Sequence, residues 1–218
     1  MDGELQRVGE STAVAVSLMH HRRLMVRQRF EAAELLGFET RNKYDVVSET
    51  GALVAFAAEQ QKGFLGFMFR QLLGHWRTFD VHFFTPDRAQ FMLARHPFRW
   101  FFQRLEVYDQ AGTFVGAIQR RFSILTKRFD VEDANGQVIM QVSSPFWRMW
   151  TFPFTARGVE VASVRKKWSG LLAEAFTDKD NFAIDFGDGT LGDAERRLVL
   201  AAAIFIDLQY FERKAGRN

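Results

Sequence analysis

The stretch from Asp178 to Asp188 concentrates oxygen-bearing side chains that could bind a metal ion. The candidate ligands are Asp178, Asp180, Asn181, Asp185 and Asp188. Carboxylate and amide oxygens are hard ligands of the kind that calcium takes. An EF-hand loop starting at Asp178 is excluded, because Phe182 and Ala183 replace its central ligand and glycine, and Gly189 replaces its last glutamate. The stretch therefore predicts either a calcium site of another kind or the acidic end of a hairpin.

A glycine pattern follows this stretch. Gly187-Asp-Gly189-Thr-Leu-Gly192 matches the dinucleotide-binding pattern, and it lies between a predicted strand and a predicted helix. The sequence given ends at Asn218, which leaves no room for the second parallel strand of that motif. We therefore expect a tight turn into a helix.

Basic and aromatic residues are neighbours in several places. Arg165-Lys166-Lys167-Trp168 places three cations beside an indole, a combination that suits a lipid headgroup interface. It would also suit a phosphate backbone, and a solvated strand end is the structural alternative. Two further basic runs are His20 to Arg23, and Arg120-Arg121 with Lys127-Arg128.

Two segments hold many large apolar side chains at close spacing. Residues 144–154 contain five aromatics in eleven positions, and strand alternation sends only half of them inward. The segment from Phe64 to Trp76 poses the same problem. Both segments could be loops that dip into a membrane, and packing in the core or at one end of the fold is the structural alternative. The residues predicted to contact lipid are Arg165, Lys166, Lys167, Trp168, Trp147, Trp150, Phe64 and Phe67.

The sequence contains no recognisable catalytic motif. The chain has no cysteine, and it shows no nucleophile elbow, P-loop or paired catalytic histidines. With five histidines and no zinc-hydrolase spacing, a zinc enzyme is not favoured either. We expect no enzyme and no catalytic residue.

Three repeated segments indicate the elements that position these residues. Each has alternating apolar residues, a polar turn with glycine, and a second alternating run, which is the pattern of a β-hairpin. The turn glycines are Gly51, Gly112 and Gly136, each seven residues after the first apolar residue of its segment. Further predicted strands cover residues 23–30, 78–84, 90–95, 159–164 and 181–186.

About twelve short strands with hairpin-length links predict an antiparallel sheet that closes into a barrel or splits into a sandwich. Two segments indicate helices, residues 61–76 and 193–214. The second is apolar all round in its middle, so it should be buried on every side, as the central helix of a barrel would be. Its predicted core residues are Leu200, Ala203, Ile204, Phe205 and Leu208.

Composition and charge set the wider class. The 218 residues are 47% hydrophobic and 25% charged, as in a globular protein, and no linker divides them. We predict an N-terminal extension over residues 1–22 and a single domain over residues 23–215. Residues 171–195 carry seven acids and one base, whereas the whole chain has a net charge of +3. This leaves a basic body, which suits an anionic phospholipid surface; nucleic acid is not expected.

No signal peptide is predicted, and the longest apolar run, from Leu198 to Ile206, is shorter than a bilayer-spanning helix. We expect a cytoplasmic protein that is peripheral to the membrane.

Four stretches resemble one known family. They are Gly37-Phe-Glu-Thr-Arg-Asn-Lys-Tyr44, His96-Pro-Phe-Arg99, Trp168-Ser-Gly170 with Glu174-Ala-Phe-Thr-Asp-Lys-Asp-Asn-Phe182, and Phe205-Ile-Asp-Leu-Gln-Tyr-Phe-Glu212. In this order they resemble the motifs of the phospholipid scramblases, a family related to the tubby-like and LURP-one-related barrels. The resemblance runs from about Leu24 to Lys214.

The resemblance implies a mainly β fold, a closed barrel of twelve antiparallel strands around a central hydrophobic C-terminal helix. It also implies phospholipid binding, an association with movement of phospholipids between leaflets, and calcium binding by the Asp178 to Asp188 segment. This chain departs from the family at Gly187-Asp188-Gly189, where the family pattern closes with Pro-x-Asp. It also has no acylation cysteines. The alternative is a soluble tubby-like barrel that acts as a lipid- or protein-binding regulatory module without moving lipids.

Overall fold

The computed structural model describes residues 16–29, 40–60, 78–145, 147–148, 150–167 and 181–210. Twelve antiparallel strands form a closed barrel, in which each strand pairs with its neighbours in sequence and β1 pairs with β12. The strands are β1 (Arg23–Arg29), β2 (Thr40–Ser48), β3 (Leu53–Gln60), β4 (Phe79–Phe84), β5 (Gln90–His96), β6 (Arg104–Asp109), β7 (Phe114–Arg121), β8 (Thr126–Asp133), β9 (Val138–Pro145), β10 (Thr151–Ala156), β11 (Val159–Lys167) and β12 (Asn181–Asp185). The predicted fold class is confirmed. The helix predicted at residues 61–76 lies outside the described residues.

The three predicted hairpin turns connect β2 to β3, β6 to β7 and β8 to β9. Gly51, Gly112 and Gly136 have φ values of 82°, 79° and 78°. This left-handed conformation costs glycine little because it has no Cβ. In each turn the glycine N–H donates to the carbonyl three residues earlier, at 3.0 to 3.1 Å. The common sequence pattern therefore reflects a common turn geometry.

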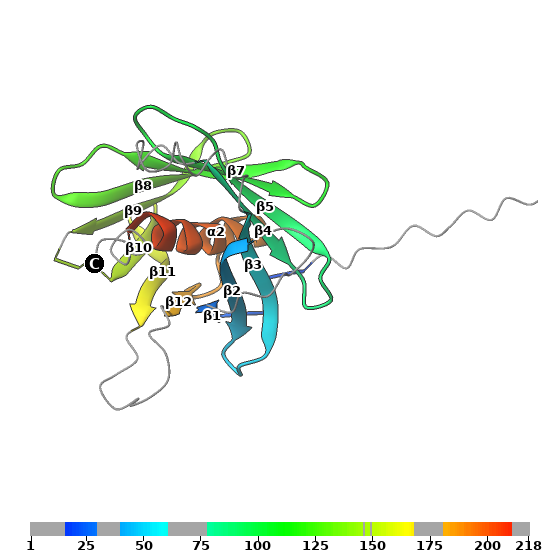
Figure 1. Ribbon diagram of the computed structural model, residues 1–218. Helices are drawn as coiled ribbons and strands as arrows, with labels where there is room; N and C mark the ends of the chain where they lie inside the picture. Colours follow the sequence, from blue (N-terminus) through cyan, green and yellow to red (C-terminus); the bar gives the residue numbers. More distant parts are fainter. Residues whose placement is uncertain are drawn as a thin grey trace, which may run out of the picture.

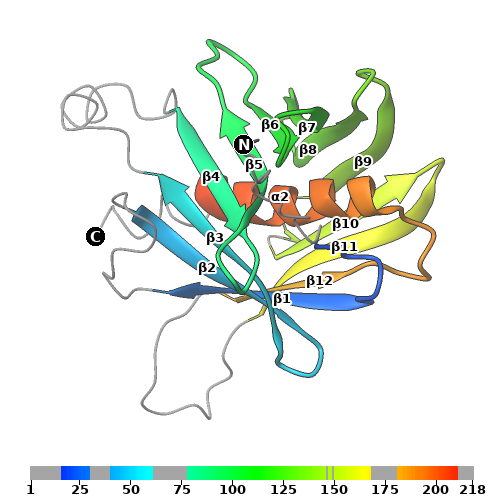
Figure 2. The ribbon, with the colours of Figure 1, turned by 90° about the vertical axis from the view of Figure 1, so that its right-hand side faces the viewer.

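Helix α2 (Asp193–Tyr210) lies inside the barrel (Figures 1 and 2). Thirteen of its residues, from Arg196 to Gln209, are buried, because strands surround it on all sides. Its predicted core residues Leu200, Ala203, Ile204, Phe205 and Leu208 are all buried. A helix with no polar stripe has no face to offer to water, and the barrel wall provides the apolar surroundings that it needs.

The first turn of α2 is tied to the N-terminal residues of the described chain. The Leu18 N–H donates to Asp193 Oδ1 at 2.7 Å. Arg196, which is buried, donates to the carbonyls of Leu18 and His21 at 3.1 and 2.5 Å. Residues 175 or more positions apart in the sequence thus close the barrel at the end where α2 begins.

The strands alternate in direction, so their connections gather at two ends. We call the end at which α2 begins the Asp193 end, and the end at which it finishes the Tyr210 end. The hairpins at Gly51, Gly112 and Gly136 belong to the Asp193 end. The connections β5–β6, β7–β8 and β9–β10 belong to the Tyr210 end. No helix among the described residues is long and apolar enough to cross a bilayer.

Candidate functional site

Three neighbouring connections at the Tyr210 end carry large apolar side chains that are exposed to solvent. They are the links β5–β6, β7–β8 and β9–β10, which antiparallel pairing places side by side. Phe101 is 85% exposed and Trp147 is 78% exposed. The full set, which we call the apolar tips, is Phe98, Trp100, Phe101, Phe102, Phe122, Ile124, Leu125 and Trp147. Exposed apolar groups gathered in one place mark a surface that binds a partner or a membrane.

The turns of the Asp193 end are of a different kind. Their strand-connecting segments carry charged or polar residues and glycine, among them Glu49, Asp87, Asp109, Asp133 and Asp188. The large apolar side chains exposed elsewhere on the described chain are Met19, Leu53, Val138 and Val159, and none is aromatic. The exposed aromatic rings of the described residues are therefore confined to one end of the barrel.

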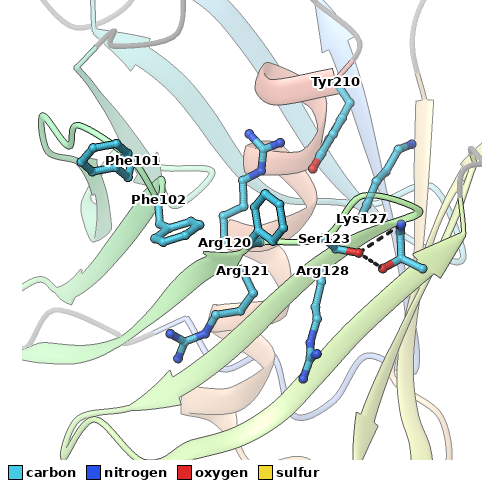
Figure 3. A pocket seen from close by; sticks show the side chains of 10 residues that line it. Phe101, Phe102, Arg120, Arg121, Ser123, Lys127, Arg128 and Tyr210 are labelled. Atoms are coloured by element: carbon cyan, nitrogen blue, oxygen red, sulfur yellow. Dashed lines mark hydrogen bonds between the residues drawn. The ribbon is translucent and has the colours of Figure 1, made fainter.

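Cations surround the apolar tips. The described residues of the three connections include Arg99 and Arg148 but no acid. Beside them a pocket of about 240 Å³ lies between the β5–β6 and β7–β8 connections and the last residue of α2. Figure 3 shows its side chains. It is lined by Phe101, Phe102, Arg120, Arg121, Phe122, Ser123, Thr126, Lys127, Arg128 and Tyr210. We call this the basic pocket.

Strand pairing explains how the basic pocket forms. The β7–β8 hairpin pairs Arg121 with Arg128 directly across the two strands, so both side chains project from the outer face of the barrel. Arg120 has the opposite orientation, and its guanidinium lies 6.0 Å from the centre of the Tyr210 ring. Lys127 Nζ lies 4.8 Å from the same ring centre and 5.0 Å from that of Phe152. Cations therefore approach the hairpin from both faces of the sheet.

The charges of the pocket are only partly compensated. Arg121 forms ion pairs with Asp130 at 2.7 Å and with Glu132 at 3.5 Å. Arg120 and Arg128 form no ion pair with the described residues. The Ser123 and Thr126 hydroxyls are hydrogen-bonded to each other at 2.5 Å and close the turn. With four cations and no acid in its lining, the pocket is electrostatically suited to an anion.

A larger pocket at the Asp193 end has the opposite character. Its volume is about 620 Å³, and its lining includes Glu160, Asp188 and Glu195 with a single cation, Arg157. The two ends therefore differ both in exposed aromatic rings and in the sign of the charge around their pockets. Of the two, only the Tyr210 end combines apolar tips with cations.

The residues predicted to contact lipid have several locations. Trp147 belongs to the apolar tips, whereas Trp150 packs partly buried against the core. Arg165 is exposed on β11. Lys166 points the other way, with its Nζ 5.3 Å from the Trp150 ring and 5.8 Å from the Phe182 ring. Lys167 ends β11 with no described side chain, and Trp168, Phe64 and Phe67 lie outside the described residues.

The predicted metal ligands are divided between the two ends of β12. Asn181 begins this strand at the Tyr210 end, and Asp185 ends it, roughly 13 Å away at the rise of a β-strand. Calcium–oxygen distances are only about 2.4 Å, so one ion cannot bind both. Asp178 and Asp180 lie outside the described residues. No group of three or more His, Asp or Glu side chains in the described part of the chain could hold a metal ion.

Asp185 and Asn181 have different local surroundings. Asp185 accepts hydrogen bonds from Arg23 Nε at 2.8 Å and from the Gly187 N–H at 3.0 Å. Burial raises the pKa of the Asp185 carboxyl, but these bonds and the nearby arginines outweigh it, so the pKa is lowered. Asn181 differs, because its buried Oδ1 accepts no hydrogen bond from the described residues. The length of β12 therefore separates Asn181 from Asp185 and Asp188, so these residues cannot share one ion.

Sequence reasoning did not select most of the apolar tips. It identified Trp147, and it noted the basic runs at Arg120 and Lys127 without assigning them to a site. A signal for the rest was present. Trp100, Phe101 and Phe102 are consecutive, and alternation cannot bury three consecutive side chains of a short link on one side of a sheet.

The chain is similar to several known proteins. The family model of Scramblase matches residues 1–213. Phospholipid scramblase 1 of Mus musculus is 28% identical over 210 residues, which cover 89% of this chain and 62% of that protein. Phospholipid scramblase 2 of Bos taurus is 26% identical over 208 residues, covering 88% and 69%. The chain thus spans less than two thirds of the length of the mouse protein.

A solved structure of a protein from Arabidopsis thaliana was also found. It aligns with a TM-score of 0.49 at 10% identity, covering 89% of this chain and 98% of that one.

Proposed function

Because the chain belongs to the scramblase family, whose model matches residues 1–213, we propose that it is a peripheral membrane protein that binds phospholipids and takes part in their movement between leaflets. Its role is to bind and handle lipid, not to make or break covalent bonds. We place it on the cytoplasmic face of the membrane. The partner is the surface of a membrane that contains anionic phospholipid.

The apolar tips are the observation that carries this proposal. Eight large apolar side chains on three neighbouring links are exposed at one end of a barrel whose interior is already filled. Such side chains gain free energy when they enter the boundary between headgroups and acyl chains, with about 1.5 to 3 kcal/mol for each large side chain that becomes fully buried. Arg99, Arg148 and the cations of the basic pocket are then level with the lipid phosphates.

The charge pattern supports the same orientation. Each Lys or Arg held near an anionic membrane surface contributes about 1 kcal/mol, and the contribution weakens with salt. The described links at the Tyr210 end contain cations and no acids, whereas the turns at the Asp193 end contain several carboxylates. The cations beside the apolar tips therefore favour contact of these three links with an anionic surface.

Calcium enters this proposal as a modulator of charge. We assign its site to Asp178, Asp180 and Asn181, because the buried Asn181 Oδ1 is an available oxygen ligand. The residues that flank the acidic segment, Lys167 and Asn181, both lie at the Tyr210 end of the barrel. A bound cation would reduce the negative charge that this segment brings towards an anionic membrane.

Vesicle flotation of the purified chain tests the proposal. We expect binding to vesicles of phosphatidylcholine with phosphatidylserine, and weaker binding when the salt concentration is raised. The double variant F101S/I124S removes two apolar tips and should lower the partition into vesicles at least about tenfold, a loss of 1.4 kcal/mol or more. The matched control V159S removes an exposed apolar residue from the other end of the barrel and should bind as the parent does.

If the parent chain fails to float with anionic vesicles at low salt, the peripheral membrane role is wrong, and a soluble regulatory barrel becomes the better description. Movement of fluorescent phospholipid between leaflets, measured with the same vesicles, then tests the second half of the proposal. Equal partition of F101S/I124S and V159S would show that the apolar tips are not the contact surface.

A further inference from the structure

We propose that the basic pocket binds the phosphate group of a phospholipid headgroup, and that it prefers a terminal phosphate over a phosphodiester. The inference deepens the proposed function and rests on it, since it assigns one site and one ligand class to a surface proposed above to meet the membrane. Three features support it: the paired arginines, the hydrogen-bond donors of the lining, and the phenyl rings beside them.

The first reason is a like-charge pair held in place by the sheet. Arg121 and Arg128 are directly opposite each other on β7 and β8. Two cations in this position repel each other and destabilise the hairpin unless an anion lies between them. Asp130 and Glu132 compensate Arg121, but Arg128 pairs with no acid of the described chain. An oxyanion bound at the turn would compensate the charge of Arg128, which no acid of the described chain pairs with.

The second reason is the set of hydrogen-bond donors. Three guanidinium groups line the pocket of about 240 Å³, that of Arg120 from the inner face of the barrel and those of Arg121 and Arg128 from the outer face (Figure 3). A guanidinium donates two parallel hydrogen bonds to phosphate oxygens, and a hydroxyl can donate a further one. A terminal phosphate presents three oxygens and up to two negative charges, whereas a phosphodiester presents two free oxygens and one charge. Arg120 and Arg128 form no ion pair with the described residues, so they supply two uncompensated positive charges, which match the two charges of the former.

The third reason is the apolar part of the lining, which indicates a lipid source for the phosphate. Phe101, Phe102 and Phe122 belong to both the basic pocket and the apolar tips. Free phosphate would gain nothing from three phenyl rings at the rim. A lipid phosphate reaches the cations while its glycerol and first acyl carbons contact the rings.

Binding of soluble probes tests the pocket without a membrane. Short-chain phosphatidate carries a terminal phosphate, and short-chain phosphatidylglycerol of equal chain length carries a diester. In isothermal titration calorimetry the parent chain should bind the phosphatidate about tenfold more tightly than the phosphatidylglycerol. Inorganic phosphate should bind more weakly than the short-chain phosphatidate, because it lacks the apolar contacts.

Matched variants assign the binding to this pocket. R120Q/R128Q removes two pocket cations, and R27Q/R157Q removes two exposed arginines elsewhere on the barrel. We expect R120Q/R128Q to lose about tenfold in phosphatidate affinity and R27Q/R157Q to retain it. The variant S123D places a carboxylate in the pocket and should also weaken binding. Circular dichroism checks that each variant is folded. If R120Q/R128Q is not folded, the variant S123D still tests the pocket.

Several outcomes would overturn the inference. Equal affinities of R120Q/R128Q and R27Q/R157Q would show that the pocket is not the site. Equal affinities for phosphatidate and phosphatidylglycerol would remove the preference for a terminal phosphate, and tighter binding of inorganic phosphate than of phosphatidate would remove the lipid source. Vesicles containing phosphatidate or phosphatidylglycerol at equal surface potential separate the two proposals. Membrane binding without pocket binding leaves only the proposed function, and pocket binding without membrane binding leaves only the inference.

Discussion

The hydroxyl of Tyr44 on β2 donates a 2.8 Å hydrogen bond to Asp207 Oδ2 on α2, and both side chains are 1% exposed. This bond joins the barrel wall to the central helix across 163 positions of sequence. A buried carboxylate is expensive to leave with fewer donors, so the bond contributes to the position of the last turns of α2.

Replacement of Tyr44 by Phe tests this link. The variant removes the hydroxyl donor and leaves the ring, so we expect a loss of about 1 to 3 kcal/mol in the free energy of unfolding. Urea denaturation followed by circular dichroism measures it. Tyr108→Phe is the control, since it removes a similar 2.9 Å bond to Glu106 near the surface. Equal losses in the two variants would show that Asp207 does not depend on Tyr44.

Gly116 on β7 provides a second test of the contact between helix and wall. Its φ is 154°, and a Cβ there would meet the Glu132 carbonyl and lie 3.0 Å from Leu198 Cδ1. Gly116→Ala should lower the free energy of unfolding by about 2 to 3 kcal/mol through strain and overpacking. Gly136→Asn is the matched control, because that turn is open and asparagine accepts a positive φ. If Gly116→Ala leaves the free energy of unfolding unchanged, the barrel wall can move away from α2.

Two tryptophans distinguish membrane contact from core packing. Trp147 is exposed among the apolar tips, whereas Trp150 packs against the core beside Lys166. With vesicles of brominated lipid, Trp147→Phe should reduce the quenching of intrinsic fluorescence, because a reporter at the membrane is lost. Trp150→Phe should increase the fraction of fluorescence that is quenched, since a shielded reporter is lost. The reverse order would place Trp150, not Trp147, at the lipid.

Calcium should act through Asp178 and Asp180. The parent chain should bind anionic vesicles more tightly with calcium than with a chelator, by about 1 kcal/mol for each negative charge neutralised. In D178N/D180N binding should be tight without calcium and should respond little to it. Asp188→Asn, at the opposite end of the barrel, should respond as the parent does. A full calcium response in D178N/D180N would contradict the assigned site.

His21 predicts a dependence of stability on pH. Burial, together with the charges of His20 and Arg196, lowers the pKa of the His21 ring below 6.5, against a smaller opposite effect of Glu49. The folded state therefore binds fewer protons than the unfolded state. The contribution of His21 to the free energy of unfolding is therefore fully present above pH 6.5 and decreases as the pH falls towards the pKa of the folded state. In His21→Gln the free energy of unfolding, measured by urea denaturation, should decrease less over this pH interval than in the parent. An equal decrease in the two proteins would exclude His21 as the cause.

Much of the fold follows from local sequence rules. The glycines at 51, 112 and 136 need a positive φ, and the apolar residues before them alternate, so the hairpins are determined by neighbours in sequence. The all-round apolar middle of α2 predicts its burial without knowledge of the strands. The closed barrel follows less directly, because the pairing of β1 with β12 joins residues such as Leu24 and Ile184 that no local rule connects.

The candidate site depends on long-range arrangement, which explains why the residues alone indicated it incompletely. A phenylalanine has the same apolar character in a core and on a tip, and only the closed barrel shows that Phe101 and Trp147 are exposed at one end. The basic pocket needs α2 as well, since Tyr210 at the end of this helix lines it. Asn181 and Asp185, close in sequence, are separated because β12 is extended.

The helix inside the barrel has a consequence for transport. Its buried side chains occupy the interior along the barrel axis, so they block the path that a headgroup would take through the barrel. A conduit mechanism would require α2 to leave the barrel, which would expose its thirteen buried residues to water. If the chain moves lipids, it must act from outside the barrel wall, by loosening the packing of the leaflet into which its aromatic rings insert. Its effect would then depend on how many copies crowd one patch of membrane.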